Sequence, residues 1–188
     1  NDPLVVYTLV VRAFQDGAYG RILELLNAVP DSGINTIVAP LLRAWSLAGQ
    51  GRTTDGIAAL ETMAANAGLA PVAGFHRALI ADLGGDPVGA EVAFRQTLVA
   101  SGGRPSLQLV DAFARFLVRA GNRDEAAALV ADFADWNPQT LLIDPVRDVV
   151  EGWAEPVRPV TEVRGGVAEV FTNVASLLNH ERLRTEAM

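Results

Sequence analysis

The chain of 188 residues has no cysteine, which excludes disulfides, thiolate metal sites and cysteine nucleophiles. Aromatic residues are also scarce, at 6% of the sequence, although half of all residues are apolar. Small and aliphatic side chains in that proportion favour closely packed helices over sheets. No apolar run approaches the roughly 18 residues of a membrane-spanning helix, so direct membrane insertion is not expected.

Basic residues are few and scattered. Fifteen Lys and Arg face 22 Asp and Glu, for a formal net charge of −7. Nucleic acid is therefore not an expected partner, because neutralising phosphates requires clustered bases. The sequence begins Asn1-Asp2-Pro3 with neither an initiator Met nor a signal-peptide pattern, which predicts a piece of a larger protein. Both the periplasm and the cytoplasm stay open as its location.

Groups that carry catalysis are sparse as well. The two histidines, His76 and His180, are too far apart in sequence to form a helical metal pair, and no nucleophile-elbow sequence occurs. We expect His76 to have an ordinary surface or half-buried role. The sequence thus predicts no catalytic residues, no metal, no cofactor and no enzymatic activity.

A glycine recurs at nearly constant spacing. Gly17, Gly51, Gly85 and Gly121 are separated by 34, 34 and 36 residues, and each lies between two apolar segments of helical pattern. Such a period is typical of stacked helical hairpins, in which the glycine ends the first helix of each pair. The expected pairs are 4–15 with 18–29, 37–48 with 53–66, 71–83 with 87–101, and 106–120 with 123–135.

Other columns fill in when the glycines are aligned. Seven residues before each glycine is a small or modest apolar residue, and five and nine residues after it are further apolar or small ones. Small residues let two helices approach closely, and larger ones fill the seam between them. The three columns are Val10, Ala44, Ala78 and Ala114; Ile22, Gly56, Ala90 and Ala126; and Leu26, Leu60, Phe94 and Val130.

This pattern resembles the tetratricopeptide repeat, whose consensus has small residues, a turn glycine, an alanine, an apolar residue and a closing proline at fixed positions. The fourth unit fits best, with Ala114, Gly121, Ala126, Val130 and Pro138. The resemblance implies an all-α fold, an α-solenoid of antiparallel helix pairs in a right-handed superhelix. The segment 75–83 is also similar to divergent bacterial repeat proteins, some of them labelled components of a TonB system.

Three regions follow from this register. Residues 1–138 form four hairpins, 139–167 form an insertion with one short helix from Asp144 to about Ala154, and 168–188 form the first helix of a truncated further repeat. Phe171, Val174, Ala175 and Leu178 give that last helix an apolar face. Arg182 would then stand where a turn glycine is expected.

The resemblance also implies a binding surface on the inner face of the superhelix. Carried over residue by residue, the apolar part of this groove is Tyr7, Val11, Leu41, Trp45, Phe75 and Leu79. Its polar end is Asp111, Arg115 and Arg119, where the acid precedes the first Arg by four residues, the favourable order for pairing on a helix. An apolar groove fits an apolar or amphipathic segment of another polypeptide.

Alternatives stay open at this point. Arg43 and Arg77 stand where the family has apolar residues, so the helices carrying the strip could be rotated and the strip could be core. The insertion at 139–167 could instead fold back over it. The leading interpretation is a non-enzymatic interaction scaffold. The alternative is a structural or oligomerisation spacer that self-associates through the ends of a severed solenoid.

Overall fold

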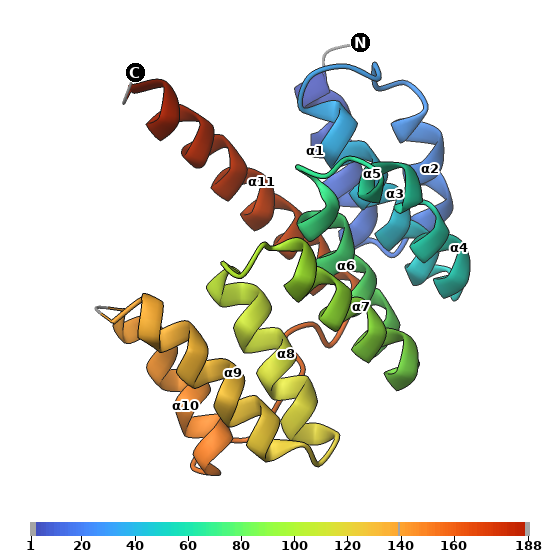
Figure 1. Cartoon of the computed structure of the whole chain (residues 1–188). Coiled ribbons are helices and arrows are strands. Elements are labelled where there is room, and N and C mark those ends of the chain that lie inside the picture. Colours follow the sequence, from blue (N-terminus) through green and yellow to red (C-terminus); the bar gives the residue numbers. More distant parts are fainter. Residues whose placement is uncertain (1–2, 139, 187–188) are drawn as a thin grey trace.

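The computed structural model describes residues 3–138 and 140–186, which form an all-helical protein without a strand (Figure 1). Seven of the eight helices expected in the four pairs are present with ends within three residues of those predicted. The elements are α1 (Pro3–Gln15), α2 (Tyr19–Leu26), α3 (Asn35–Gly49), α4 (Thr53–Ala58), α5 (Glu61–Ala64), α6 (Ala70–Leu83), α7 (Pro87–Ala100), α8 (Leu107–Arg119), α9 (Arg123–Trp136), η1 (Leu141–Ile143), α10 (Asp144–Glu151) and α11 (Val163–Glu186).

The four recurring glycines make the same turn. Gly17, Gly51, Gly85 and Gly121 all have positive φ, between 68° and 86°. After each, the next N–H reaches the carbonyl five residues back, as Asn122 does to Leu117 at 2.8 Å. This geometry ends a helix and satisfies its last carbonyls. The glycine spacing therefore predicted four hairpins correctly, α1 with α2, α3 with α4, α6 with α7, and α8 with α9.

The aligned columns are the core of these hairpins. All four residues that precede the glycines by seven are completely buried, and the columns in the second helices are buried too. Gly56 shows why one column member has no side chain. A Cβ there would lie 2.7 Å from the Ala44 carbonyl oxygen on the partner helix. The two backbones approach too closely for any larger residue.

One predicted helix is divided. Residues 53–66 form α4 and α5 rather than one helix, with Leu60 between them. Leu60 donates its backbone N–H to the Ile57 carbonyl, three residues back, in a tighter turn than that of an α-helix. The completely buried Leu60 side chain stays in its core column despite this break.

The glycine turn occurs once more after α9, where the sequence analysis did not place it. Gly152 ends α10 with φ of 89°, and Trp153 donates to the Asp148 carbonyl at 2.8 Å. α10 packs on α8 and α9, beside the fourth hairpin (Figure 1). The expected short helix in the insertion is confirmed, but it continues the series, and the next turn is at Gly152 rather than at Arg182.

α11 corrects the prediction of a further repeat at 168–188. It begins at Val163 and packs mainly on α3, with further contacts to α6 and α1, instead of stacking beyond α9 (Figure 1). Its buried face is Val167, Val170 and Val174. Of the face predicted for it, only Val174 is buried, since contact with α3 fixes the orientation of the helix. Within the described part of the chain, no helix is long and apolar enough to cross a membrane.

Candidate functional site

The predicted apolar strip lies on one surface made by α1, α3 and α6, and α11 covers it. Leu41 and Trp45 on α3 have no exposed surface, and Phe75 and Leu79 on α6 are 5% and 1% exposed. Tyr7 and Val11 on α1 are half-buried. The prediction of an open groove at Leu41, Trp45, Phe75 and Leu79 was therefore wrong. The alternative of core is correct for these four. The alternative that 139–167 folds back over the strip is correct in part, because α11 begins at Val163 and its Gly166 lies on Trp45, while the rest of the helix continues past 167.

The contact between α11 and α3 centres on Gly166 and Trp45. A Cβ added to Gly166 would lie 2.3 Å from the six-membered part of the Trp45 indole. No real Cβ tolerates such a distance, so only glycine lets the backbone of α11 rest on this ring. The neighbouring Gly165 differs, because a Cβ there would meet Val160 at an ordinary 3.6 Å.

The other side of Trp45 is held by His76 on α6. Trp45 Nε1 donates to His76 Nδ1 at 3.0 Å, and both side chains are completely buried. Burial lowers the pKa of His76 to about 3, so the imidazole is neutral at physiological pH. Because Nδ1 accepts, the proton is assigned to Nε2, which is buried and has no hydrogen-bond partner. The expectation of a surface or half-buried His76 was wrong.

Glu169, one turn beyond Gly166 on α11, is a second residue with a buried polar atom that lacks a hydrogen bond. Its Oε2 atom is buried and has no hydrogen-bond partner. Burial raises the pKa of this carboxyl, and the negative charge of Asp111 on α8 raises it further. The interface between α11 and the rest of the protein thus contains a poorly satisfied acid.

The predicted polar end of the groove divides into two parts. Asp111 and Arg115 form the expected pair along α8, with Arg115 Nε 2.6 Å from Asp111 Oδ1. Arg119 does not join them. It binds Asp82 on α6 with Nη2 at 2.5 Å from Oδ2, and it also donates to the Pro156 carbonyl at 3.3 Å.

Asp82 is a nearly buried acid, paired with two arginines, that no sequence pattern indicated. Its side chain is 8% exposed and accepts from both Arg119 and Arg158, the latter at 3.1 Å. The two arginines are 37 and 76 residues away in sequence. No local pattern marks such a pairing, and an acid within an apolar stretch was the only available signal. The cluster ties α6, α8 and the segment leading into α11 together.

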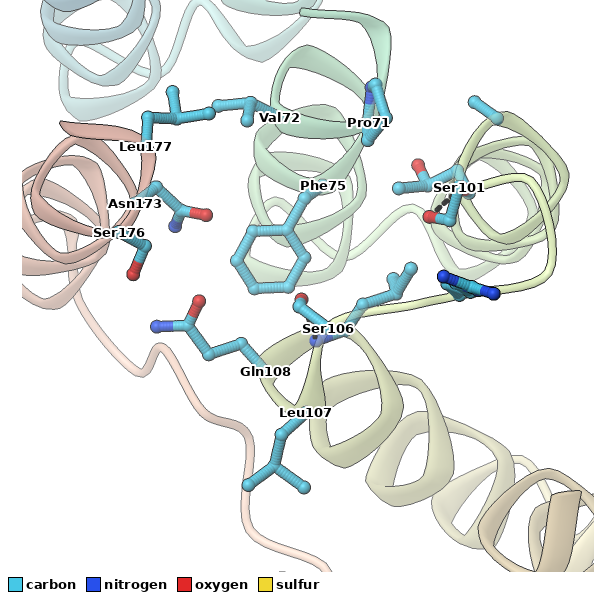
Figure 2. A pocket seen from close by; sticks show the side chains of 14 residues that line it. Pro71, Val72, Phe75, Ser101, Ser106, Leu107, Gln108, Asn173, Ser176 and Leu177 are labelled. Carbon is cyan, nitrogen blue, oxygen red and sulfur yellow. Dashed lines mark hydrogen bonds between the residues drawn. The ribbon is translucent and has the colours of Figure 1, made fainter. Parts of the chain in front are cut away.

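An opening remains where α11 leaves the strip. A cavity of about 600 Å³ lies between α6, the end of α7, the start of α8 and the middle of α11. Figure 2 shows the Phe75 ring pointing into it, with Gln108 and Asn173 facing each other at one side and Leu177 beyond them. Its walls are largely apolar, and its volume falls within the roughly 300–1,000 Å³ of ligand sites.

The polar groups of the cavity are amides, hydroxyls and the guanidinium of Arg104. Asn173 donates its Nδ2 to the Glu169 carbonyl at 2.8 Å, which leaves its side-chain oxygen toward the cavity side. Ser106 uses its hydroxyl oxygen to cap α8 by accepting from the Leu109 N–H. Neutral amides around an apolar floor can pair with peptide groups, since they offer both donors and acceptors.

No metal-ligating group of three or more His, Asp or Glu occurs among the residues whose side chains the structure describes. Comparison of the chain with models of protein families, with curated proteins and with solved structures gave no match. The class of protein that can be stated is therefore an all-helical protein of glycine-terminated hairpins. Its most site-like feature is the cavity beside Phe75.

Proposed function

We propose that this chain is an α-solenoid of the tetratricopeptide type, a non-enzymatic scaffold that holds another polypeptide. The support for the solenoid is the repetition itself. Four hairpins share one turn geometry and three buried columns, and a fifth such turn follows at Gly152. Units that complete their cores against neighbours stack into extended arrays that present continuous surfaces for partners.

The cavity is the observation that carries the binding role. It lies between the first helices of two successive hairpins, α6 and α8, on the surface to which the resemblance assigns the partner. An apolar side chain of a partner would fill the space beside Phe75. The amide of Gln108, on α8, would pair with a polar group of the same segment. This combination of an apolar pocket and amide contacts is suited to a polypeptide segment.

Site-specific photo-crosslinking tests this function. A benzophenone amino acid at Gln108 places the reactive group in the cavity, and the same group at Val92, half-exposed on α7, is the matched control. We expect a discrete adduct with another polypeptide from position 108 in cells and not from position 92. Equal labelling from both positions, or no adduct from 108, would contradict a partner in the cavity.

The alternative, a spacer or oligomerisation module, has its own support. Val5 and Leu9 leave apolar side chains exposed on α1, at 57% and 43%. A second copy could cover them. Light scattering of the native chain and of a Val5→Lys and Leu9→Lys double variant distinguishes the roles, because a spacer predicts a dimer that the double variant abolishes.

A further inference from the structure

α11 occupies the surface that the proposed function assigns to a partner. It is an α-helix laid on the apolar strip of α1, α3 and α6, and its anchor points are Gly166 on the Trp45 ring and the valines 167, 170 and 174. α11 therefore shows the shape of helix that this surface accepts. The helix needs a glycine at the crossing with Trp45 and valines spaced by three and four residues.

Trp45 cannot adapt to a different helix easily. Its ring has no exposed surface, and its Nε1 is held by His76. The ring therefore acts as a fixed feature that selects a residue without a Cβ at the crossing point. Any other helix that docks here must present the same small residue.

The fit of α11 is incomplete in two places. Glu169 is half-buried with an unsatisfied oxygen and with Asp111 of like charge across the interface. Beyond it, the cavity beside Phe75 separates the middle of α11 from α6 and α8. A buried acid without a partner weakens an interface, and an unfilled cavity forfeits packing contacts.

An extended segment without helix joins α11 to α10. Residues 153–162 connect α10 to α11 without a helix and contain Pro156 and Pro159. The connection is held near its middle by Arg119, which binds the Pro156 carbonyl, and by Arg158, which binds Asp82. Because both attachments precede α11, they do not depend on α11 remaining on the strip.

We propose that α11 occupies the inner face until an α-helix of the partner polypeptide displaces it. That helix carries a glycine over Trp45, aliphatic residues at the valine positions, and no acid where α11 has Glu169. The glycine and the aliphatic residues follow from the contacts that α11 makes with this surface. The absence of an acid follows from the unsatisfied Glu169. The proposal rests on the proposed function and names the kind of partner and its control.

The test uses the full chain and a fluorescein-labelled peptide of residues 161–179 that carries Glu169→Gln. The peptide stands in for the partner's helix, and anisotropy measures its affinity for four chains. These are the native chain, Gly166→Ala, Gly165→Ala and Glu169→Gln. The apparent affinity of an occluded site is its intrinsic affinity reduced by the fraction of molecules in which it is open.

We expect Gly166→Ala to bind the peptide about tenfold or more tightly than the native chain, because its own α11 clashes with Trp45 and opens the site more often. Gly165→Ala is the matched control and should bind no more tightly than the native chain, since its methyl group has room. Glu169→Gln should bind the peptide more weakly than the native chain, because its own α11 is better satisfied.

Hydrogen exchange shows whether Gly166→Ala acts locally. Faster exchange confined to α11 is expected, with the amides of α7 to α9 unchanged. If that variant fails to fold, the weaker binding by Glu169→Gln still tests the proposal. Equal affinities in all four chains would overturn it. Dimerisation of Gly166→Ala without peptide binding would also overturn it and assign the surface to a second copy.

The peptide result depends on this chain alone, whereas the crosslink at position 108 depends on a cellular partner. An adduct at 108 with no effect of the α11 variants would leave the scaffold role standing and reject the displacement. Displacement of α11 by the peptide without an adduct at 108 would reject a partner in the cavity and keep the inner face as a surface that accepts a helix.

Discussion

Trp45 and His76 form a completely buried hydrogen bond between α3 and α6, with 3.0 Å between Nε1 and Nδ1. The two rings also meet edge to face, with centroids 6.1 Å apart. The bond fixes the indole against which α11 rests. It connects the second hairpin to the third and both of them to the covering helix.

Replacing His76 by Gln should remove an acid sensitivity of the fold. The pKa of the buried imidazole is lowered to about 3, below its ordinary 6.5, so the unfolded state takes up the proton first. His76 therefore makes the free energy of unfolding fall between pH 6.5 and 3, by up to about 1.4 kcal/mol per pH unit. Urea unfolding at pH 7.5, 5.5 and 4.5 should show a smaller loss in His76→Gln than in the native chain.

The control for this measurement is Trp45→Phe. It removes the hydrogen-bond donor and leaves His76 in place. This variant should be less stable at pH 7.5 and keep the pH dependence of the native chain. A His76→Gln chain with an unchanged pH profile would contradict the burial of a neutral imidazole.

The two arginines on Asp82 should differ in their contribution to stability. Arg119→Met leaves a nearly buried carboxylate with only the more exposed Arg158, and should lower the free energy of unfolding by about 2 kcal/mol. Arg158 is 46% exposed, so Arg158→Met should cost no more than about 1 kcal/mol. Methionine keeps much of the aliphatic stem in both variants. Equal losses in chemical denaturation would show that Asp82 does not depend mainly on Arg119.

Glu169→Gln should stabilise the native chain at neutral pH. The pKa of Glu169 is raised, first by burial and then by Asp111, so its ionised form is disfavoured in the folded state. The free energy of unfolding is therefore higher at low pH, where Glu169 is protonated. It decreases as the pH rises through the pKa that Glu169 has in the folded state. The gain from Gln should reach about 1 kcal/mol or less at pH 7.5 and shrink toward pH 4.

Glu162→Gln is the matched control for this change. Glu162 is exposed and pairs with the exposed Arg164, so its replacement should have little effect at either pH. Thermal unfolding of both variants and of the native chain at pH 7.5 and pH 4 measures the difference. A destabilised Glu169→Gln chain at pH 7.5 would show that the carboxylate is satisfied after all.

Two glycines should respond to alanine with opposite sign. Gly85 ends α6 with φ of 78°, and Gly85→Ala should cost about 1–2 kcal/mol although a methyl group would meet no atom within 4 Å. Gly20 lies within α2 with equal space, and Gly20→Ala should add about 0.5 kcal/mol through helix propensity. Chemical denaturation of both variants separates backbone conformation from packing. Equal effects would contradict the turn assignment of Gly85.

Much of the local structure could be predicted from the sequence. The glycine spacing located four turns, and the aligned columns located the buried seam of each hairpin, including the completely buried Ala44, Ala78 and Ala114. These features are local, because a helix end and a helix pair depend on residues within about one repeat. The pairing of Asp111 with Arg115 was predictable for the same reason.

The sequence by itself determined the helices, their turns and the faces that join neighbouring helices, because the periodicity of small and apolar residues records short-range packing. Only the tertiary structure decided that α11 returns to α3, that Gly166 rests on Trp45, and that Asp82 pairs with Arg119 and Arg158. These contacts join residues 37 to more than 100 positions apart. Whether an apolar strip is groove or core depends on which distant segment covers it, and no repeat pattern specifies that segment.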